Sequence, residues 1–154
     1  MTEIHLTPIG FVRGGRGVVE DDDWGAVTAR IELDPAVIDP ESTSGLDDFS
    51  HIEVVFRFDR VDEAGVCRGA RHPRGREDWP LVGILGQRAK DRPNRLGLTT
   101  CEVRAVGPGW IDVAGLDAVD GTPVLDVKPY MHGFAPRGEV REPAWAAELM
   151  AGYW

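Results

Sequence analysis

Apolar and polar residues alternate in several short runs along this chain, and a period of two is the pattern of a half-buried β-strand. The run 26–33 shows it most clearly, because every second residue from Val27 to Leu33 is apolar. We expect strands over 4–12, 26–33, 51–61, 81–85, 96–106, 110–113 and 124–127. Glycine and proline separate these runs, as in the turn at 107–109.

One segment has the helical period instead. From 143 to 154, alanine, tryptophan, leucine and methionine recur at helical spacing, which predicts a C-terminal helix that docks on the body or on a partner subunit. The many short strands, with only short helical pieces between them, indicate an all-β protein built as a closed barrel or a sandwich. We expect one domain over 1–154, because 154 residues can bury a real core and no repeat or linker divides them.

Composition narrows the class of protein. Hydrophobic residues make up 42% and charged residues 28% of the chain, as in an ordinary globular domain. No apolar run approaches the roughly 20 residues of a membrane span, so we expect no membrane partner. The first ten residues lack the features of a signal peptide, and two cysteines, Cys67 and Cys101, make no disulfide framework. These features predict a cytoplasmic location.

The charges are unevenly distributed. The net charge of −9 argues against a general nucleic-acid-binding protein. Residues 68–95, however, hold eight lysines and arginines against three acids, a formal charge of +5. A basic face on an acidic body would attract a polyanion locally, and we expect one here. If the two halves of the segment point in different directions, no such patch forms.

The end of this basic segment carries a distinctive loop. Four basic residues lie close together between two expected strands: Arg88, Lys90, Arg92 and Arg95. Pro93 fixes its own φ and disfavours helical geometry at Arg92, so the sequence Arg-Pro-Asn at 92–94 predicts a rigid turn. Guanidinium groups on this turn would suit carboxylates, phosphates or flat rings. The alternative is the solvated tip of a hairpin.

A second group of polar residues lies at the end of an expected strand. Asp126, Lys128 and Tyr130 alternate with other residues, so they share one face. A carboxylate, an ammonium and a phenol together could orient or deprotonate an amide-like nitrogen, which makes these three the candidate catalytic residues. A buried ion pair capped by a tyrosine would produce the same pattern, and the sequence leaves both interpretations open.

Other catalytic classes find no support. The chain has no HExxH or CxxC motif and no close pair of histidines, so we expect no metal site. It lacks GxSxG and contains only three serines, which argues against a hydrolase. The glycine-rich segment 13–17 lacks the spacing of phosphate-binding loops, and we expect a flexible loop there.

Three blocks of sequence together resemble one known family. They are GLDDFSH at 45–51, QRAKDRPNRLGLT at 87–99 and LDAVDGTPVLDVKPY at 116–130. In this order they resemble the TsaA-like (TrmO) family, the S-adenosylmethionine-dependent methyltransferases of threonylcarbamoyladenosine in tRNA. The resemblance covers about residues 4–132, and the two longer blocks carry its specificity, because GLDDFSH alone is a weak signal.

The resemblance implies a cofactor site. S-adenosylmethionine would lie against a set of residues from several loops: Arg88, Leu98, Asp117, Ala118, Val119 and Asp120, with the strand-end pair Asp59 and Arg60. On the substrate side the candidates are Arg92 and Asn94. The family's Pro-Arg-Gln cofactor segment has no match here, and Asp59 stands where the family usually has histidine. Without the family, the run 116–123 would be interpreted as a structural Asp-Gly turn.

The resemblance also implies a fold and a function. We expect a compact closed β-barrel that forms a homodimer and methylates threonylcarbamoyladenosine beside the tRNA anticodon, with tRNA bound along 68–95. One alternative is a methyltransferase of the same fold that acts on a small molecule, which the short chain, the acidic body and the absent Pro-Arg-Gln segment favour. The other is a non-enzymatic barrel that binds a nucleotide or a protein partner, and the intact longer blocks speak against it.

Overall fold

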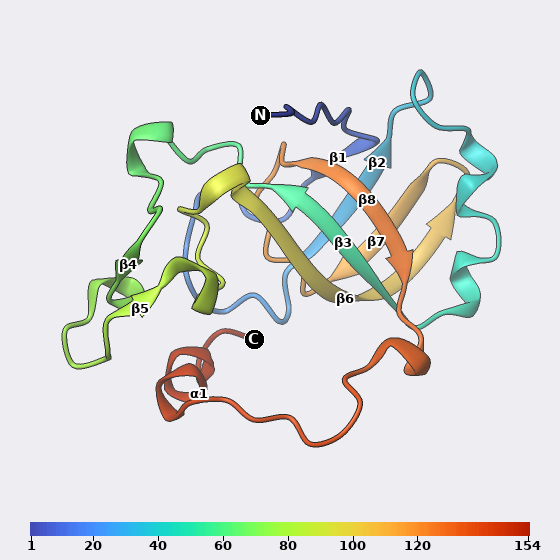
Figure 1. Cartoon of the computed structure of the whole chain (residues 1–154). Coiled ribbons are helices and arrows are strands. Elements are labelled where there is room, and N and C mark those ends of the chain that lie inside the picture. The colour runs from blue at the N-terminus through green and yellow to red at the C-terminus, as the bar shows by residue number, and fades with distance from the viewer.

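Six antiparallel strands form a closed barrel in the computed structural model, which describes all residues 1–154 (Figure 1). The strands are β1 (Gly10–Arg13), β2 (Thr28–Leu33), β3 (His51–Arg57), β6 (Leu96–Gly107), β7 (Trp110–Ala114) and β8 (Pro123–Pro129). Their order around the barrel is β1-β2-β7-β6-β3-β8, and β8 pairs with β1 to close it. The expected all-β fold with a closed barrel is confirmed.

The remaining elements are short. β4 (Ala70–Arg71) and β5 (Val82–Gly83) form a separate two-stranded sheet. Single turns of 3-10 helix lie in the connections, at Pro40–Thr43, Leu46–Asp48, Glu63–Gly65, Pro73–Gly75, Ile84–Gly86, Pro93–Arg95 and His132–Phe134. The one α-helix, α1 (Ala144–Met150), falls within the segment where a helix was expected. None of these helical segments has the length and apolar character that crossing a membrane requires.

Some strands are shorter than their apolar patterns indicated. The first begins at Gly10 rather than Ile4, because its residue-by-residue pairing with β2 and β8 starts at that point. The strand expected over 51–61 ends at Arg57. The apolar run 81–85 contributes only β5 and the start of a helical turn. A strand needs a neighbour for its backbone hydrogen bonds, and β4 offers one for two residues only.

Alternation places one face of each strand inside the barrel. The interior cluster consists of Val12, Ile31, Leu33, Ile52, Val54, Phe56, Cys101, Ile111, Val113, Leu116, Ala118 and Val124. Phe56 is its largest member, and its ring lies over Gly97 on the neighbouring strand. A Cβ at Gly97 would stand 2.5 Å from the ring atoms, so only glycine fits there.

The long strand β6 has different partners along its two halves. β3 pairs with β6 from Leu96 to Glu102, whereas β7 pairs with it only from Glu102 onward. The register of the β6–β7 pair then shifts between Val103 and Ala105. The edge of residues 96–101 that faces away from β3 therefore has no strand partner. We call it the open edge of β6.

The C-terminal segment returns to the barrel. After β8 the chain runs along the bottom of Figure 1 and reaches α1, which lies beside β4 and β5. The indole N–H of Trp79 donates to the Glu148 carboxylate on α1, with 2.8 Å between Nε1 and Oε2. The rings of Trp79 and Trp145 lie 6.5 Å apart. The helix thus docks on the body of its own chain.

Candidate cofactor and active site

The guanidinium of Arg88 lies against the open edge of β6. Arg88 follows the helical turn Ile84–Gly86, and its Nη2 donates to the backbone carbonyl of Leu98. Arg88 makes no ion pair with a carboxylate. The side chain of Leu98 points outward, and 45% of the residue is exposed. An unneutralised cation and an apolar surface therefore stand side by side at this edge.

The turn that follows β7 reaches the same edge. The carboxylate of Asp117 accepts hydrogen bonds from the Thr99 hydroxyl on one oxygen and from the Tyr153 hydroxyl on the other. Ala118 and Val119 are buried, so their side chains cannot contact a ligand. The backbone N–H groups of residues 117–119, by contrast, donate to no acceptor within the chain. The turn therefore carries three N–H donors without a partner in the chain.

Arg60 fastens the far end of the turn. Its two terminal nitrogens donate to the carbonyls of Gly17 and Asp120, at 2.6 and 3.0 Å. One oxygen of the Asp120 carboxylate accepts from the N–H of Gly14 at 2.9 Å. The glycine-rich segment 13–17 is therefore tied to the turn. The Asp59 side chain is exposed and makes no hydrogen bond, so nothing holds it toward the turn.

Asp126 and Lys128 lie on the outer face of the barrel. Their side chains form an ion pair of 2.9 Å, and the exposed fractions are 48% and 69%. The interpretation as a buried ion pair is therefore wrong. The hydrogen bond and charge of Asp126, with a smaller effect of Glu53, raise the pKa of Lys128, so this residue is a cation at neutral pH. Tyr130 is half-buried, and its N–H donates to the carbonyl of His51 at 2.9 Å.

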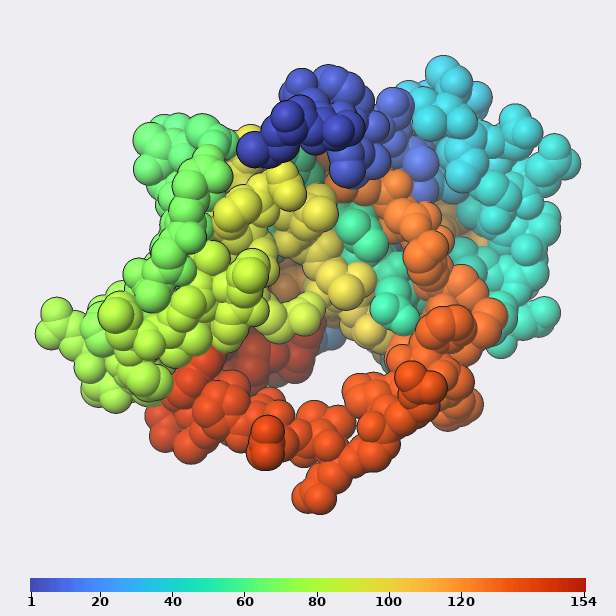
Figure 2. All heavy atoms as spheres, viewed as in Figure 1, coloured from blue at the N-terminus to red at the C-terminus, as the bar shows by residue number.

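Strand register places the two groups on one surface. Paired residues of neighbouring strands point to the same face, and Leu98 pairs with Val55, which pairs with Asp126. Two strand spacings separate Leu98 from Asp126, about 10 Å. Figure 2 shows an opening between the barrel and the segment that connects β8 to α1. The outer face of β6, β3 and β8 is thus the candidate active surface.

The Arg-Pro-Asn turn combines an extended residue with two residues of positive φ. Arg92 is extended, with φ −131°, as its position before proline requires. The next two residues after Pro93, Asn94 and Arg95, both adopt left-handed backbone angles, φ 63° and 55°. The Arg95 side chain donates to the carbonyl of Val61 at 2.7 Å and holds this conformation. Non-glycine residues in this region are uncommon and gather at functional sites.

The expected basic face is largely neutralised. Six of the eight basic residues of 68–95 form ion pairs with carboxylates: Arg68, Arg71, Arg74, Arg76, Lys90 and Arg95. Several of these acids, such as Glu63 and Asp22, lie outside the segment. Only Arg88 and Arg92 lack an acidic partner, and Arg92 donates instead to the carbonyl of Gln87 at 2.6 Å. Arg92 is the first residue of the Arg-Pro-Asn turn, and Arg88 precedes it by four positions.

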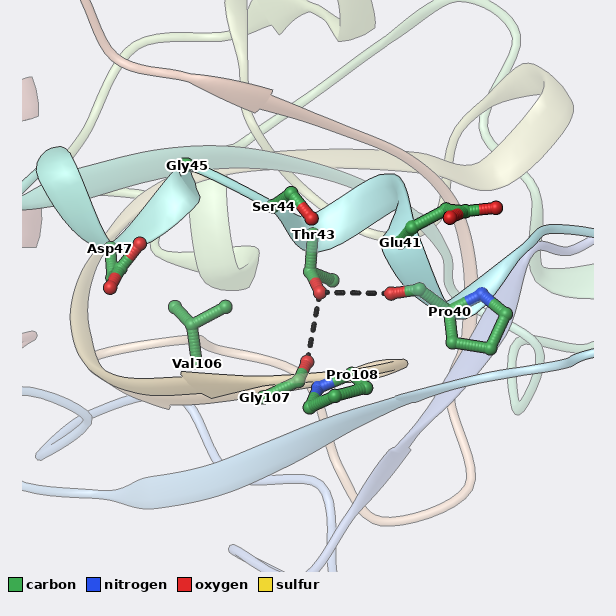
Figure 3. Close-up of a pocket in the computed structure, with 9 residues that line it drawn as sticks. All are labelled: Pro40, Glu41, Thr43, Ser44, Gly45, Asp47, Val106, Gly107 and Pro108. Carbon is green, nitrogen blue, oxygen red and sulfur yellow. Dashed lines mark hydrogen bonds between the residues drawn. The ribbon is translucent and has the colours of Figure 1, made fainter.

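A pocket of about 490 Å³ lies elsewhere, between the turns at 40–47 and the β6–β7 connection (Figure 3). The Thr43 hydroxyl bridges the carbonyls of Pro40 and Gly107 beneath it, at 3.2 and 2.8 Å. Of its lining side chains only Val106 is hydrophobic, and none of the candidate residues borders it. The pocket is therefore separate from the candidate active surface.

Sequence reasoning missed two residues of the site. Thr99 and Tyr153 hold the Asp117 carboxylate from opposite sides. Thr99 lies within the block 87–99, but its place in the alternating pattern of β6 is that of an ordinary inward-facing residue. Tyr153 follows α1, 36 positions after Asp117, and no local pattern connects the two. Only the tertiary fold reveals this contact.

Comparison with known proteins identifies the family. A sequence model of the tRNA-methyltransferase O N-terminal domain matches residues 22–135. A probable S-adenosyl-L-methionine-binding protein of Methanothermobacter thermautotrophicus is 35% identical over 132 residues, which are 83% of this chain and 90% of that protein. The human tRNA (adenine(37)-N6)-methyltransferase is 36% identical over 102 residues, 66% of this chain and 23% of that protein.

The same relationship appears in three dimensions. A crystal structure of TrmO from Pseudomonas aeruginosa superposes with a TM-score of 0.69 at 26% identity, over 92% of this chain and 62% of that one. This chain spans 44% of the Pseudomonas aeruginosa methyltransferase RcsF, a curated relative that is 35% identical to it over 108 residues. Because the family model covers more than half of the chain and the barrel agrees, this chain belongs to the family of the tRNA-methyltransferase O N-terminal domain.

Proposed function

We propose that this protein transfers the methyl group of S-adenosylmethionine to the N6 nitrogen of threonylcarbamoyladenosine at position 37 of tRNA. One observation carries the proposal: Arg88, which lacks an acidic partner, lies at the open edge of β6 beside exposed Leu98. The turn 117–119, with its unpaired N–H groups, reaches the same edge. Relatives named as methyltransferases of adenine 37 and as S-adenosylmethionine-binding proteins support it.

These residues fit the chemistry of the cofactor. A guanidinium without an acidic partner suits the carboxylate of the methionine moiety, which a lysine or an already paired arginine would serve less well. Leu98 offers an apolar surface to the adenine ring. The free N–H groups of residues 117–119 match the ring nitrogens of adenine, which accept hydrogen bonds. Arg60 and Asp120 would hold the turn in place, and Asp59 is the weakest member of the set.

The outer face of β8 would serve the transfer itself. Bound S-adenosylmethionine would supply a methyl group carried on a sulfonium. The acceptor nitrogen would bond to the methyl carbon, and the electron pair of the carbon–sulfur bond would remain on sulfur. Asp126 would accept the proton that this nitrogen loses. Lys128 is already protonated, so it cannot be the base, and its ion pair would orient the Asp126 carboxylate. Tyr130 would position the substrate, and the face as a whole would align the reactants.

The substrate and assembly follow from the same surface. Arg92 and Asn94, on the rigid turn, would contact the modified nucleoside or its phosphates.

We place the enzyme in the cytoplasm, where tRNA is modified, and as a homodimer. Phe134 and Val140 in the segment between β8 and α1 are 80% and 69% exposed, which suits burial against a second copy.

A small-molecule acceptor is the second candidate. It is favoured by the internal pairing of six of the eight basic residues in 68–95, which leaves little free charge for the phosphates of a polynucleotide. In that case Arg88 and Asp126 keep their roles, and only the acceptor differs.

The test is a methyl-transfer assay with labelled S-adenosylmethionine and two tRNA substrates of one sequence. One carries threonylcarbamoyladenosine at position 37, and the other carries adenosine there. We expect label only in the first, at N6. Equal labelling of both, or label in neither, would refute the assignment of this substrate.

A further inference from the structure

The C-terminal segment reaches into the candidate cofactor site. The hydroxyl of Tyr153 donates to one oxygen of Asp117, while the Thr99 hydroxyl donates to the other. Tyr153 is partly buried, and burial together with the charge of Asp117 raises the pKa of its phenol. The phenol therefore stays protonated and remains a donor at neutral pH.

The backbone around Tyr153 is anchored separately from this hydroxyl. The N–H groups of Asp23 and Trp24 donate to the carbonyls of Gly152 and Tyr153, at 3.0 and 2.8 Å. The ring of Tyr153 packs edge-on against Trp154, with 4.8 Å between centroids. Removal of the hydroxyl alone would leave these contacts in place. The hydroxyl has one specific role, which is to hold Asp117.

Asp117 opens the turn whose backbone is free to bind. Its N–H and the two that follow have no partner in the chain, and buried Ala118 and Val119 pin the turn from below. Two donors on the carboxylate fix the direction of the first residue and hence of these N–H groups. A hydrogen bond to a carboxylate is stronger than a neutral one, so loss of one donor should loosen the turn.

We propose that Tyr153 is a positioning residue of the cofactor site, which acts through Asp117 to hold the backbone of 117–119 toward the adenine of the ligand. This inference rests on the proposed function. It extends the site to the C-terminal segment, which the three sequence blocks do not include. Tyr153 touches neither the reacting atoms nor, by this account, the cofactor.

The test compares two variants by calorimetric titration with S-adenosylhomocysteine. Tyr153→Phe removes only the hydroxyl, whereas Glu148→Ala loosens the C-terminal segment at Trp79 and leaves Asp117 untouched. We expect Tyr153→Phe to bind about tenfold more weakly, as for the loss of one charge-assisted hydrogen bond. We expect Glu148→Ala to bind like the native chain, even where its melting temperature falls as much. The variant Asp117→Ala, which removes the acceptor, should make the further change Tyr153→Phe nearly silent.

The possible outcomes distinguish a failure of the positioning role of Tyr153 from a failure of the proposed methyltransferase function. If the native chain binds and Tyr153→Phe binds equally well, the positioning role is overturned and the proposed function stands. If Glu148→Ala weakens binding as much as Tyr153→Phe, the segment acts only through general stability and the positioning role is again overturned. If the native chain itself does not bind, both proposals fall.

Discussion

Two carboxylates face the Lys128 ammonium from neighbouring strands, and only one of them forms an ion pair with it. Asp126 forms the ion pair of 2.9 Å, and Glu53 is directly opposite Lys128 in the β3–β8 pair. Asp126 is aligned across the strands with Leu98, because both pair with Val55. Glu53 lies two residues before Val55 on β3. The two carboxylates thus differ in their ion pairing with Lys128 and in their alignment with Leu98.

This difference gives a matched pair of variants. Asp126→Asn should lower kcat about 100-fold, because an amide cannot accept the proton of the acceptor nitrogen. Its affinity for S-adenosylhomocysteine should not change, since Asp126 is not among the cofactor residues. Glu53→Gln should keep kcat within about threefold. Steady-state kinetics would decide, and equal losses in the two variants would contradict the role of Asp126.

The two thiols should differ in reactivity. Burial, and secondarily the charge of Asp117, raises the pKa of the Cys101 thiol to about 12. We expect a thiol reagent at pH 8 to label the half-buried Cys67 and to label Cys101 only after unfolding. The unfolded chain loses this proton near pH 9 and the folded chain does not, so stability should fall between pH 9 and about 12. Rapid labelling of both thiols in the folded protein would contradict this.

At the level of secondary-structure elements, the alternation of apolar residues was sufficient to predict a strand that pairs with a neighbour along its whole length. β2 and β7 lie close to their expected ranges because alternation and pairing agree along them. Residues 81–85 show the opposite case, since their apolar pattern found a partner of only two residues. Arg88 contacts Leu98, and Asp117 contacts Thr99, so the blocks 87–99 and 116–130 meet. The Tyr153–Asp117 contact depends instead on a docked segment that no local signal places.

The Arg-Pro-Asn turn permits a test at this scale. Asn94 has φ 63°, which glycine adopts freely and a β-branched residue does not. We expect Asn94→Gly to keep the free energy of unfolding within about 0.5 kcal/mol, and Asn94→Val to lower it by about 1 to 2 kcal/mol. Urea denaturation measures both. Asn94→Gly should still raise KM for tRNA, because the amide is lost while the turn remains, and an unchanged KM would remove Asn94 from the substrate site.

The whole molecule is acidic, and most of its basic residues form ion pairs with its own carboxylates. The segment 68–95 has a formal charge of +5, yet six of its eight cations pair with carboxylates, some of them outside the segment. Sequence arithmetic could not foresee this, because the pairing depends on which loops the fold brings together. Recognition of tRNA by this chain would therefore rest on a few contacts near the site.

The salt dependence of tRNA binding measures the number of contacts with tRNA phosphates. Arg88 is assigned to the cofactor carboxylate, so Arg92 is the one basic residue of the segment without an acidic partner that is left for phosphate. The plot of log affinity against log salt should therefore have a slope of about −1. Fluorescence anisotropy with a labelled anticodon stem-loop, between about 50 and 200 mM salt, would provide it. A slope steeper than about −4 would require many more phosphate contacts than Arg92 supplies.

The central claim is that the open edge of β6 binds the cofactor through Arg88, and calorimetric titration with S-adenosylhomocysteine tests it most directly. Arg104→Ala is the matched control, because Arg104 is an exposed arginine of the same strand with only a 3.6 Å ion pair to Glu102. We predict that the native chain and Arg104→Ala bind alike, and that Arg88→Ala binds at least about 30-fold more weakly, as for a lost ionic contact. Binding by Arg88→Ala equal to that of the native chain would contradict the claim.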